Sequence, residues 1–227
     1  MNTTAVMRHF AAIFLISTAS AGTAETIDEI VVTADYRGRA LDEVAASITV
    51  LDADAIEGLA VQHFEELVYS VPNLNWSGDG HRARYFQIRG VGELEQYQGA
   101  PNPSVGFLVD DIDFSGIGTI ATLFDVERVE VLRGPQGSRY GANALAGLIY
   151  VQSALPTSER NGRVTLSAAD DDAFSAGLAF GGAITNDQRA LYRISAHHHT
   201  SNGYRDNPFL GRDDTNGRDE TTVRGRL

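Results

Sequence analysis

The chain has 227 residues, a formal net charge of -12 and no cysteine. The acidic balance argues against a general nucleic-acid binder, which should present a basic face. The lack of cysteine excludes a disulfide framework, a thiolate metal site and a cysteine nucleophile, and the length allows one domain and part of a second.

The first 24 residues have the composition of an export signal. Arg8 supplies positive charge, residues 10–16 form a short apolar run, and small residues follow. The run is too short to cross a bilayer as a helix, so we expect a secretory signal peptide cleaved after Ala24. A short membrane anchor is the alternative. No later stretch reaches about 18 apolar residues, so a membrane role would have to use strands.

Residues 27–34 read IDEIVVTA, a short β-prone segment between polar flanks. Such a segment, exposed near a terminus, can add as a strand to the sheet edge of a partner protein. The alternative is that it forms an ordinary first strand of the domain that follows.

From residue 41 to residue 155 the chain alternates short strands and helices. Hydrophobic periodicity and turn residues predict helices over 52–59 and 62–70, the second ending before Pro72. The predicted strands lie at 47–51, 86–88, 105–109, 126–132 and 148–151. The fourth strand runs directly into Arg133-Gly134-Pro135, which ends it because Gly134 permits unusual backbone angles and Pro135 lacks a ladder donor.

After Pro156 the pattern changes to strict alternation of apolar and polar residues. In residues 174–184, for example, Phe174 and Leu178 share one face while Ser175 and Gly177 share the other. Segments of about ten residues with this period are typical of strands in outer-membrane barrels. A soluble antiparallel sandwich with one wet face is the alternative. The predicted strands are 163–168, 174–184, 191–199 and 222–227.

Four motifs, in order along the chain, resemble the plug domain of TonB-dependent outer-membrane receptors. They are Pro72-Asn73-Leu74, FQIRGVG at 86–92, PSVGFLVD at 103–110, and the strand, Arg-Gly-Pro stop and glycine turn of 123–147. Members of that family hold a small α+β plug inside a transmembrane β-barrel and import scarce nutrients.

The resemblance implies an α+β plug domain followed by the beginning of an antiparallel transmembrane β-barrel, incomplete in this chain. We expect a signal peptide over 1–24, a TonB box and flexible segment over 25–39, the plug over 40–156 and the first barrel strands over 157–227. Three or four strands cannot close, since the smallest such barrels have about 8, and the plugged receptors have about 22. The chain is therefore interpreted as a fragment or a truncated product.

The resemblance assigns three sets of residues. The TonB box, which in the family pairs with the energy-coupling protein TonB in the periplasm, would consist of Asp28, Glu29, Ile30, Val31, Val32, Thr33 and Ala34. A polar network between plug and barrel wall would use Arg89, Glu127, Glu130 and Arg133. The outward-facing plug loops would offer a ligand His81, Arg82, Arg84, Tyr97 and Gln98. For the last two sets the alternative is that solvated turn and loop residues play no such role.

Three other patterns are weaker indications of function. The sequence Asp111-x-Asp113 resembles the start of a calcium loop, but the twelfth position is Thr122 instead of the bidentate Glu, so we interpret it as coincidence. Asp110-Asp111 also departs from the family's usual Asp-Gly, which questions the local turn geometry. His197 and His199 share a strand face and are interpreted as polar residues of the barrel interior. We expect no catalytic residues, no metal site and no cofactor.

The predicted function is that of an outer-membrane receptor for energy-coupled uptake of a scarce nutrient, with a ferric siderophore as the expected ligand. The expected partners are the TonB energy-coupling protein, an extracellular small molecule such as a metal chelate, and outer-membrane lipid, with no nucleic acid. Two alternatives stay open: a truncated remnant that transports nothing, and a soluble periplasmic binding module made of the plug alone.

Overall fold

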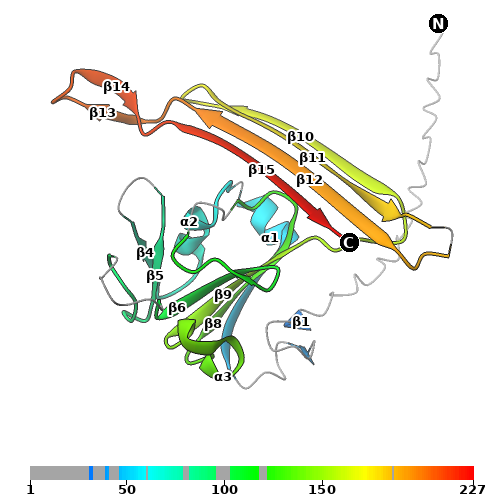
Figure 1. Cartoon of the computed structure of the whole chain (residues 1–227). Coiled ribbons are helices and arrows are strands. Elements are labelled where there is room, and N and C mark those ends of the chain that lie inside the picture. Colours follow the sequence, from blue (N-terminus) through cyan, green and yellow to red (C-terminus); the bar gives the residue numbers. More distant parts are fainter. Residues whose placement is uncertain are drawn as a thin grey trace, which may run out of the picture.

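The computed structural model describes residues 31–32, 39–40, 46–59, 61–78, 82–95, 103–117, 122–185 and 187–227. The predicted signal peptide and most of the predicted TonB box lie outside these residues. Figure 1 shows two parts: a smaller body that mixes helices and strands, and four long strands that arch over it. Among the described residues, no helix is long and apolar enough to cross a membrane.

The smaller body is built on a five-stranded sheet, called here the plug sheet, with strand order β3-β8-β9-β6-β7. Its strands are β3 (Ser47–Asp52), β8 (Val126–Arg133), β9 (Gly147–Ser153), β6 (Val105–Val109) and β7 (Ile112–Asp113). The β6–β9 pair is parallel and the other pairs are antiparallel. Every residue of β6 and β9 is buried, which explains the apolar runs at 105–109 and 147–151 in the sequence.

The predicted helices are present but shorter than expected. Helix α1 (Ala53–Gly58) begins after Asp52, whose carboxylate accepts a hydrogen bond of 2.8 Å from the Ala55 amide. The helix predicted over 62–70 is divided into α2 (Phe64–Leu67) and the 3-10 turn η2 (Val68–Ser70). A 3-10 turn tightens the end of the helix before Pro72, which cannot continue it.

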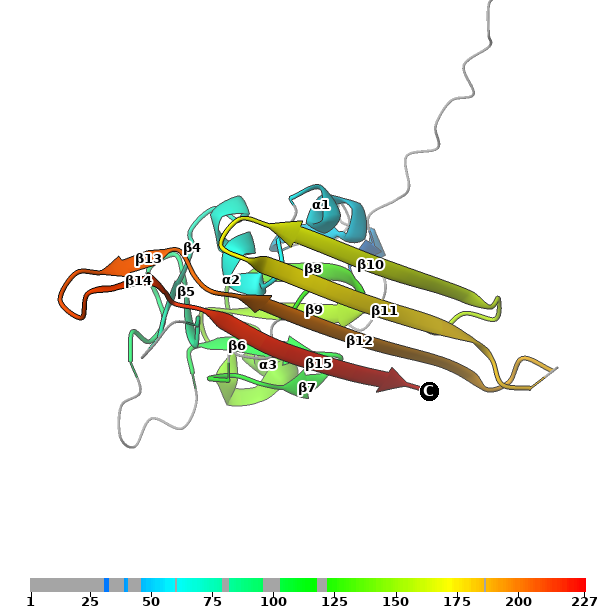
Figure 2. The ribbon, with the colours of Figure 1, turned by 90° about the horizontal axis from the view of Figure 1, so that it is seen from above.

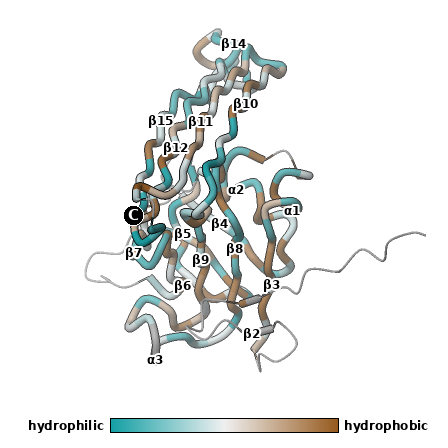
Figure 3. The backbone as a smooth tube through the Cα atoms, turned by 90° about the vertical axis from the view of Figure 1, so that its right-hand side faces the viewer, coloured by the Kyte–Doolittle hydropathy of each residue, from teal (hydrophilic) through white to brown (hydrophobic). Residues whose placement is uncertain are grey.

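Short strands and turns complete the plug. A two-stranded sheet joins β4 (Leu74–Ser77) to β5 (Tyr85–Ile88), and α3 (Gly137–Tyr140) with the 3-10 turn η4 (Gly141–Asn143) follows β8. Figures 1 and 3 place α3 at the end of the plug farthest from the long strands. Between the plug sheet and its helices lies the main apolar core. At its centre the rings of Phe64, Phe86 and Phe107 lie 5.3–5.5 Å from one another.

The four long strands form a separate antiparallel sheet, called here the long sheet, in the order β10-β11-β12-β15. They are β10 (Asn161–Ala169), β11 (Ala173–Ala183), β12 (Leu191–Ser201) and β15 (Arg218–Arg226), as the alternating pattern predicts. Figure 2 shows them side by side above the plug. The sheet is open, in agreement with a barrel that is only begun in this chain.

The two faces of the long sheet differ in the way the period-2 pattern predicts. Val164 is 70 % exposed and Leu166, Phe174 and Val223 are exposed as well, whereas Ala179 and Ser195 on the opposite face are buried against the plug. Figure 3 shows hydrophilic and hydrophobic residues alternating along these strands. A hairpin of β13 (Arg205–Asn207) and β14 (Arg212–Thr215), which the sequence did not predict, projects beyond the sheet.

Asp110 and Asp111 form the two-residue connection between β6 and β7, where Val109 pairs with Ile112. Both have positive φ, 50° and 68°, as a type I′ hairpin requires. Hydrogen bonds hold the turn: the Ser153 amide donates to Asp110 at 2.9 Å, and the Tyr150 hydroxyl donates to Asp111 at 3.0 Å. Asp110-Asp111 therefore forms a tight two-residue turn, although the family that the sequence resembles usually has Asp-Gly there.

The Tyr150 bond gives a pH-dependent prediction. Burial first, and then the hydrogen bond to Asp111 and the nearby carboxylates, raise the pKa of Tyr150 above its ordinary value. A raised folded-state pKa means that this contribution to stability is present below the unfolded pKa of about 10 and is lost as the pH rises above it. We expect Tyr150→Phe to flatten the fall of the urea midpoint above about pH 10. Tyr69→Phe, at an exposed side chain, is the control, and equal slopes in the two variants would contradict the assignment.

Candidate functional site

The contact between the plug and the long sheet centres on residues 122–125, the turn that leads into β8. Phe124 is 9 % exposed and inserts into the inner face of the long sheet. Its ring stacks on His197 with centroids 5.0 Å apart, and the Arg163 guanidinium lies 5.7 Å from the ring centroid. Gly177 leaves the space for this ring, because a Cβ added there would overlap it.

Asp125, the next residue, is held by a two-pronged ion pair. Arg193 on β12 donates from Nε at 2.8 Å and from Nη2 at 2.5 Å to the two carboxylate oxygens. Both side chains are largely buried. Arg224 on β15 donates to the backbone carbonyl oxygen of Phe124.

A second ion-pair network joins α2 to β15. Arg82 donates from Nη1 to Glu65 at 2.5 Å and from Nε to Glu220 at 2.7 Å. Glu65 also accepts the Ala83 amide at 2.8 Å and lies 3.3 Å from Arg218. Four charged side chains, two from the plug and two from the long sheet, thus form one network. No sequence motif links these four residues.

This network changes the interpretation of Arg82, which the sequence placed in a ligand-facing loop. Arg82 is only 8 % exposed and its guanidinium is committed to two carboxylates. A buried arginine must be paired, so that side chain does not face outward. Arg84 is half-buried, with Nε 2.9 Å from the carbonyl oxygen of Gly116. His81, Tyr97 and Gln98 lie outside the described residues.

Three of the residues predicted to link the plug to the barrel wall, Glu127, Glu130 and Arg133, make contacts inside the plug. Arg128 pairs with Glu130 at 3.1 Å and with Glu127 at 3.3 Å, and Arg133 donates to the Ser47 hydroxyl at 3.3 Å and to the Thr49 hydroxyl. Burial, and then the neighbouring charge of Arg89, lower the pKa of Arg133. An anionic partner would relieve the repulsion between these two positive charges. The pairing of Arg89 and Arg133 with carboxylates of the barrel stays a prediction.

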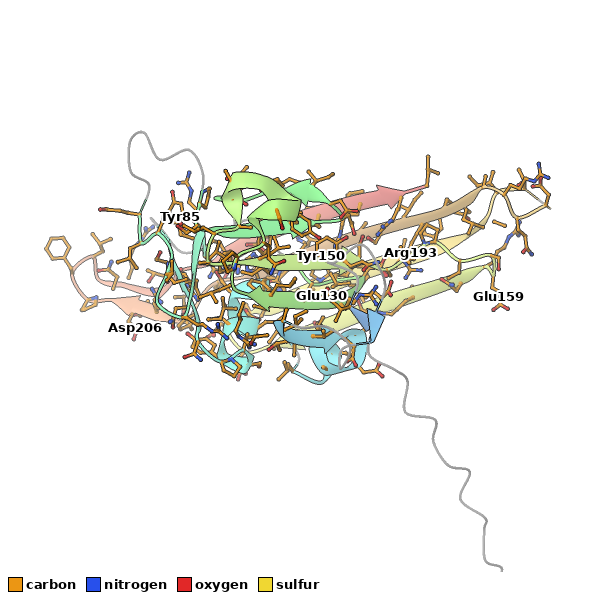
Figure 4. The ribbon with its side chains drawn as sticks, turned by 90° about the horizontal axis from the view of Figure 1, so that it is seen from below. Tyr85, Glu130, Tyr150, Glu159, Arg193 and Asp206 are labelled. Carbon is orange, nitrogen blue, oxygen red and sulfur yellow. The ribbon has the colours of Figure 1, made fainter. Side chains whose placement is uncertain are left out.

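A cavity of about 290 Å³ lies where the β13–β14 hairpin meets the plug. Aromatic side chains and charged groups of both signs surround it: Glu66, Tyr69, Trp76, His199, Tyr204, Arg205 and Arg218. Figure 4 places Tyr85 and Asp206 at this end of the molecule and Glu159 at the other. Among the described residues, no cluster of three or more potential metal ligands occurs.

Val31–Val32, the described part of the predicted TonB box, forms the short strand β1, which pairs with β2 (Arg39–Ala40) of the same chain. The backbone of these two residues is therefore engaged within the chain. The other box residues lie outside the described part, and docking to TonB stays a prediction.

Comparison with known proteins gives one consistent result. Residues 40–148 match the family described as TonB-dependent Receptor Plug Domain. The pesticin receptor of Yersinia pestis is 29% identical over 190 residues, which cover 83% of this chain and 28% of that protein. The vitamin B12 transporter BtuB of Vibrio vulnificus (strain CMCP6) is 35% identical over 155 residues, which cover 65% of this chain and 24% of that protein.

Solved structures agree. The crystal structure of the ferric yersiniabactin uptake receptor FyuA from Yersinia pestis superposes with a TM-score of 0.65 at 29% identity, covering 79% of this chain and 28% of that one. The chain thus spans about a quarter of the length of the curated relatives it matches.

Proposed function

Since this chain belongs to the TonB-dependent receptor family through its plug domain, we propose that it provides the plug and first wall strands of an outer-membrane receptor for energy-coupled uptake of a ferric siderophore. One observation carries the proposal: a plug is fixed by largely buried ion pairs to the inner face of a sheet whose outer face exposes a band of apolar side chains.

The outer face suits a lipid environment. Apolar side chains at alternate positions of β10 and β11, together with Ile194 on β12 and Val223 on β15, face away from the plug and are exposed, and such a band is what the lipid-facing side of a barrel requires. A soluble module made of the plug alone would gain nothing from this face, so the arrangement favours a membrane receptor over that alternative.

The cavity beside the β13–β14 hairpin suits a ligand that is both aromatic and anionic. Tyr69 and Tyr204 are largely exposed there, and Arg205 and Arg218 lie beside them. Arginine forms forked hydrogen bonds with carboxylates and catecholates, and flat rings stack on tyrosine and tryptophan. Carboxylates and catecholates are the groups with which many chelators bind ferric iron, which supports a metal chelate as the ligand.

Uptake is expected to depend on Val31. Docking to a TonB partner would replace the two-residue β1–β2 ladder by pairing with the partner's strand, and each pairing uses backbone donors. Val31→Pro removes one donor. In a receptor with a closed barrel that carries this sequence, we expect the variant to bind a radiolabelled ferric tris-catecholate complex normally but to import it only at the rate of de-energised cells.

The matched control is Val31→Thr, which keeps the amide and the preference for strands. It should import at the normal rate. Normal import by Val31→Pro would remove the TonB box from the proposal, and failure of the unmodified receptor to bind any of a panel of ferric catecholate and hydroxamate chelates would remove the ligand class. Recovery of the protein in the soluble periplasmic fraction would favour the plug-only module.

A further inference from the structure

We propose that residues 122–125 are a fixed anchor, which stays attached to the long sheet while the rest of the plug rearranges during transport. Phe124 and Asp125 are then positioning residues: they touch no ligand, but they determine which part of the plug moves. The inference rests on the proposed transport function and adds to it a residue-level division of the plug.

The first argument is that this one turn reaches all four strands of the long sheet. Phe124 lies against Arg163 of β10, Gly177 of β11 and His197 of β12. Arg224 of β15 holds its carbonyl oxygen. By contrast, the ion-pair network of Arg82 reaches β15 alone. A side chain seated in a socket made by a glycine cannot slide along the sheet without overlapping neighbouring side chains.

The second argument concerns the Asp125–Arg193 pair. The pair is bidentate and largely shielded from water. The backbone of Asp125 has a positive φ of 57°. A forked pair fixes orientation as well as distance, and a non-glycine residue keeps a left-handed conformation only where its surroundings hold it there. The turn is therefore fixed in both position and direction.

The third argument is the position of β3, the first strand of the plug sheet that a pull from the N-terminal side would reach. Among the described residues, β3 is an edge strand whose one neighbour in the plug sheet is β8. Its first residue, Ser47, pairs with Arg133, at the opposite end of β8 from the anchor. Detaching β3 from that end would open the plug sheet pair by pair without loading residues 122–125.

The test locks the anchor. Because the sequence has no native cysteine, Asp125→Cys with Arg193→Cys places two unique thiols where the ion pair stood, and a short thiol-to-thiol cross-linker joins them. If the anchor stays fixed during transport, the cross-linked receptor should import ferric tris-catecholate within about two-fold of the unmodified receptor. Loss of import with retained chelate binding would overturn the anchor while leaving the proposed function intact.

Removing the anchor gives the reciprocal result. We expect Asp125→Arg and Arg193→Asp each to lower the maximal import rate about ten-fold with little change in chelate binding, and the double exchange to restore import. Import at the normal rate in both single variants would overturn the proposal. A purely structural role would instead reduce binding and import in parallel. The control is Arg189→Met, in the turn between β11 and β12, whose side chain is 87 % exposed and pairs only with nearby Asp187 among the described residues.

A final measurement needs no transport. It therefore tests the anchor even if the protein does not bind the chelate used above. Thr122 is buried in the contact, so the thiol of Thr122→Cys should react with a maleimide at least about ten-fold more slowly than that of Tyr69→Cys. Combination with Arg193→Asp should remove the protection. Fast labelling of Thr122→Cys in the otherwise unchanged chain would overturn the anchor.

Discussion

Arg82→Met is expected to lower the free energy of unfolding by about 3–5 kcal/mol, the usual cost of removing one partner from a buried ion pair. Without the guanidinium, the Glu65 carboxylate would stay buried with the Ala83 amide and the more distant Arg218 and His63 as its described partners. Glu220 would lose two donated hydrogen bonds from the same side chain. Methionine keeps most of the side-chain volume, so the loss reports charge and hydrogen bonding more than packing.

The chain offers a clean reporter for this measurement. Trp76 is the single tryptophan and packs against the main core, so its fluorescence follows unfolding of the plug in urea. Arg82→Met with Glu65→Met should recover part of the loss, because the buried Glu65 carboxylate is then no longer left without the guanidinium. Arg189→Met should leave the midpoint unchanged. A loss of less than about 1 kcal/mol in Arg82→Met would mean that the network behaves like a surface ion pair.

The strands of the plug and of the long sheet could be predicted because each leaves its own mark in the sequence. β6 and β9 are buried on both faces and form apolar runs, and the long strands alternate because one face meets the plug. β4 is only four residues long, and the β13–β14 hairpin is polar and irregular in register. Neither gives a periodic pattern, so neither was predicted.

The contacts that fix the plug could not be predicted from local sequence. Arg82 resembles any loop arginine until Glu220, 138 residues later, is placed beside it. The same holds for Phe124, whose role depends on a glycine at position 177 in another sheet. Asp125 lies within a motif that the sequence analysis identified, yet only the fold shows that Arg193 pairs with it. A motif identifies the family, whereas long-range pairing decides what each charged residue does.

Phe107→Ala is expected to destabilise the plug by about 3–5 kcal/mol, the range for removing a buried phenylalanine side chain. Phe107 is 1 % exposed in β6, and its ring meets both Phe64 on α2 and Phe86 on β5. The substitution leaves a cavity at the point where helix, small sheet and plug sheet meet, and it also removes two aromatic contacts worth about 0.5–1.5 kcal/mol each. Because β6 leads into the Asp110 turn that holds Arg226 of β15, the loss should also loosen the contact with the long sheet.

Phe209→Ala is the matched control, since it deletes the same side chain where it is 93 % exposed at the tip of the β13–β14 hairpin. A change within about 0.5 kcal/mol is expected there. Both variants are measured by urea titration followed through Trp76 fluorescence. Equal small losses in the two variants would mean that the three rings do not form the core of the plug, and the placement of β5 and β6 against α2 would have to be revised.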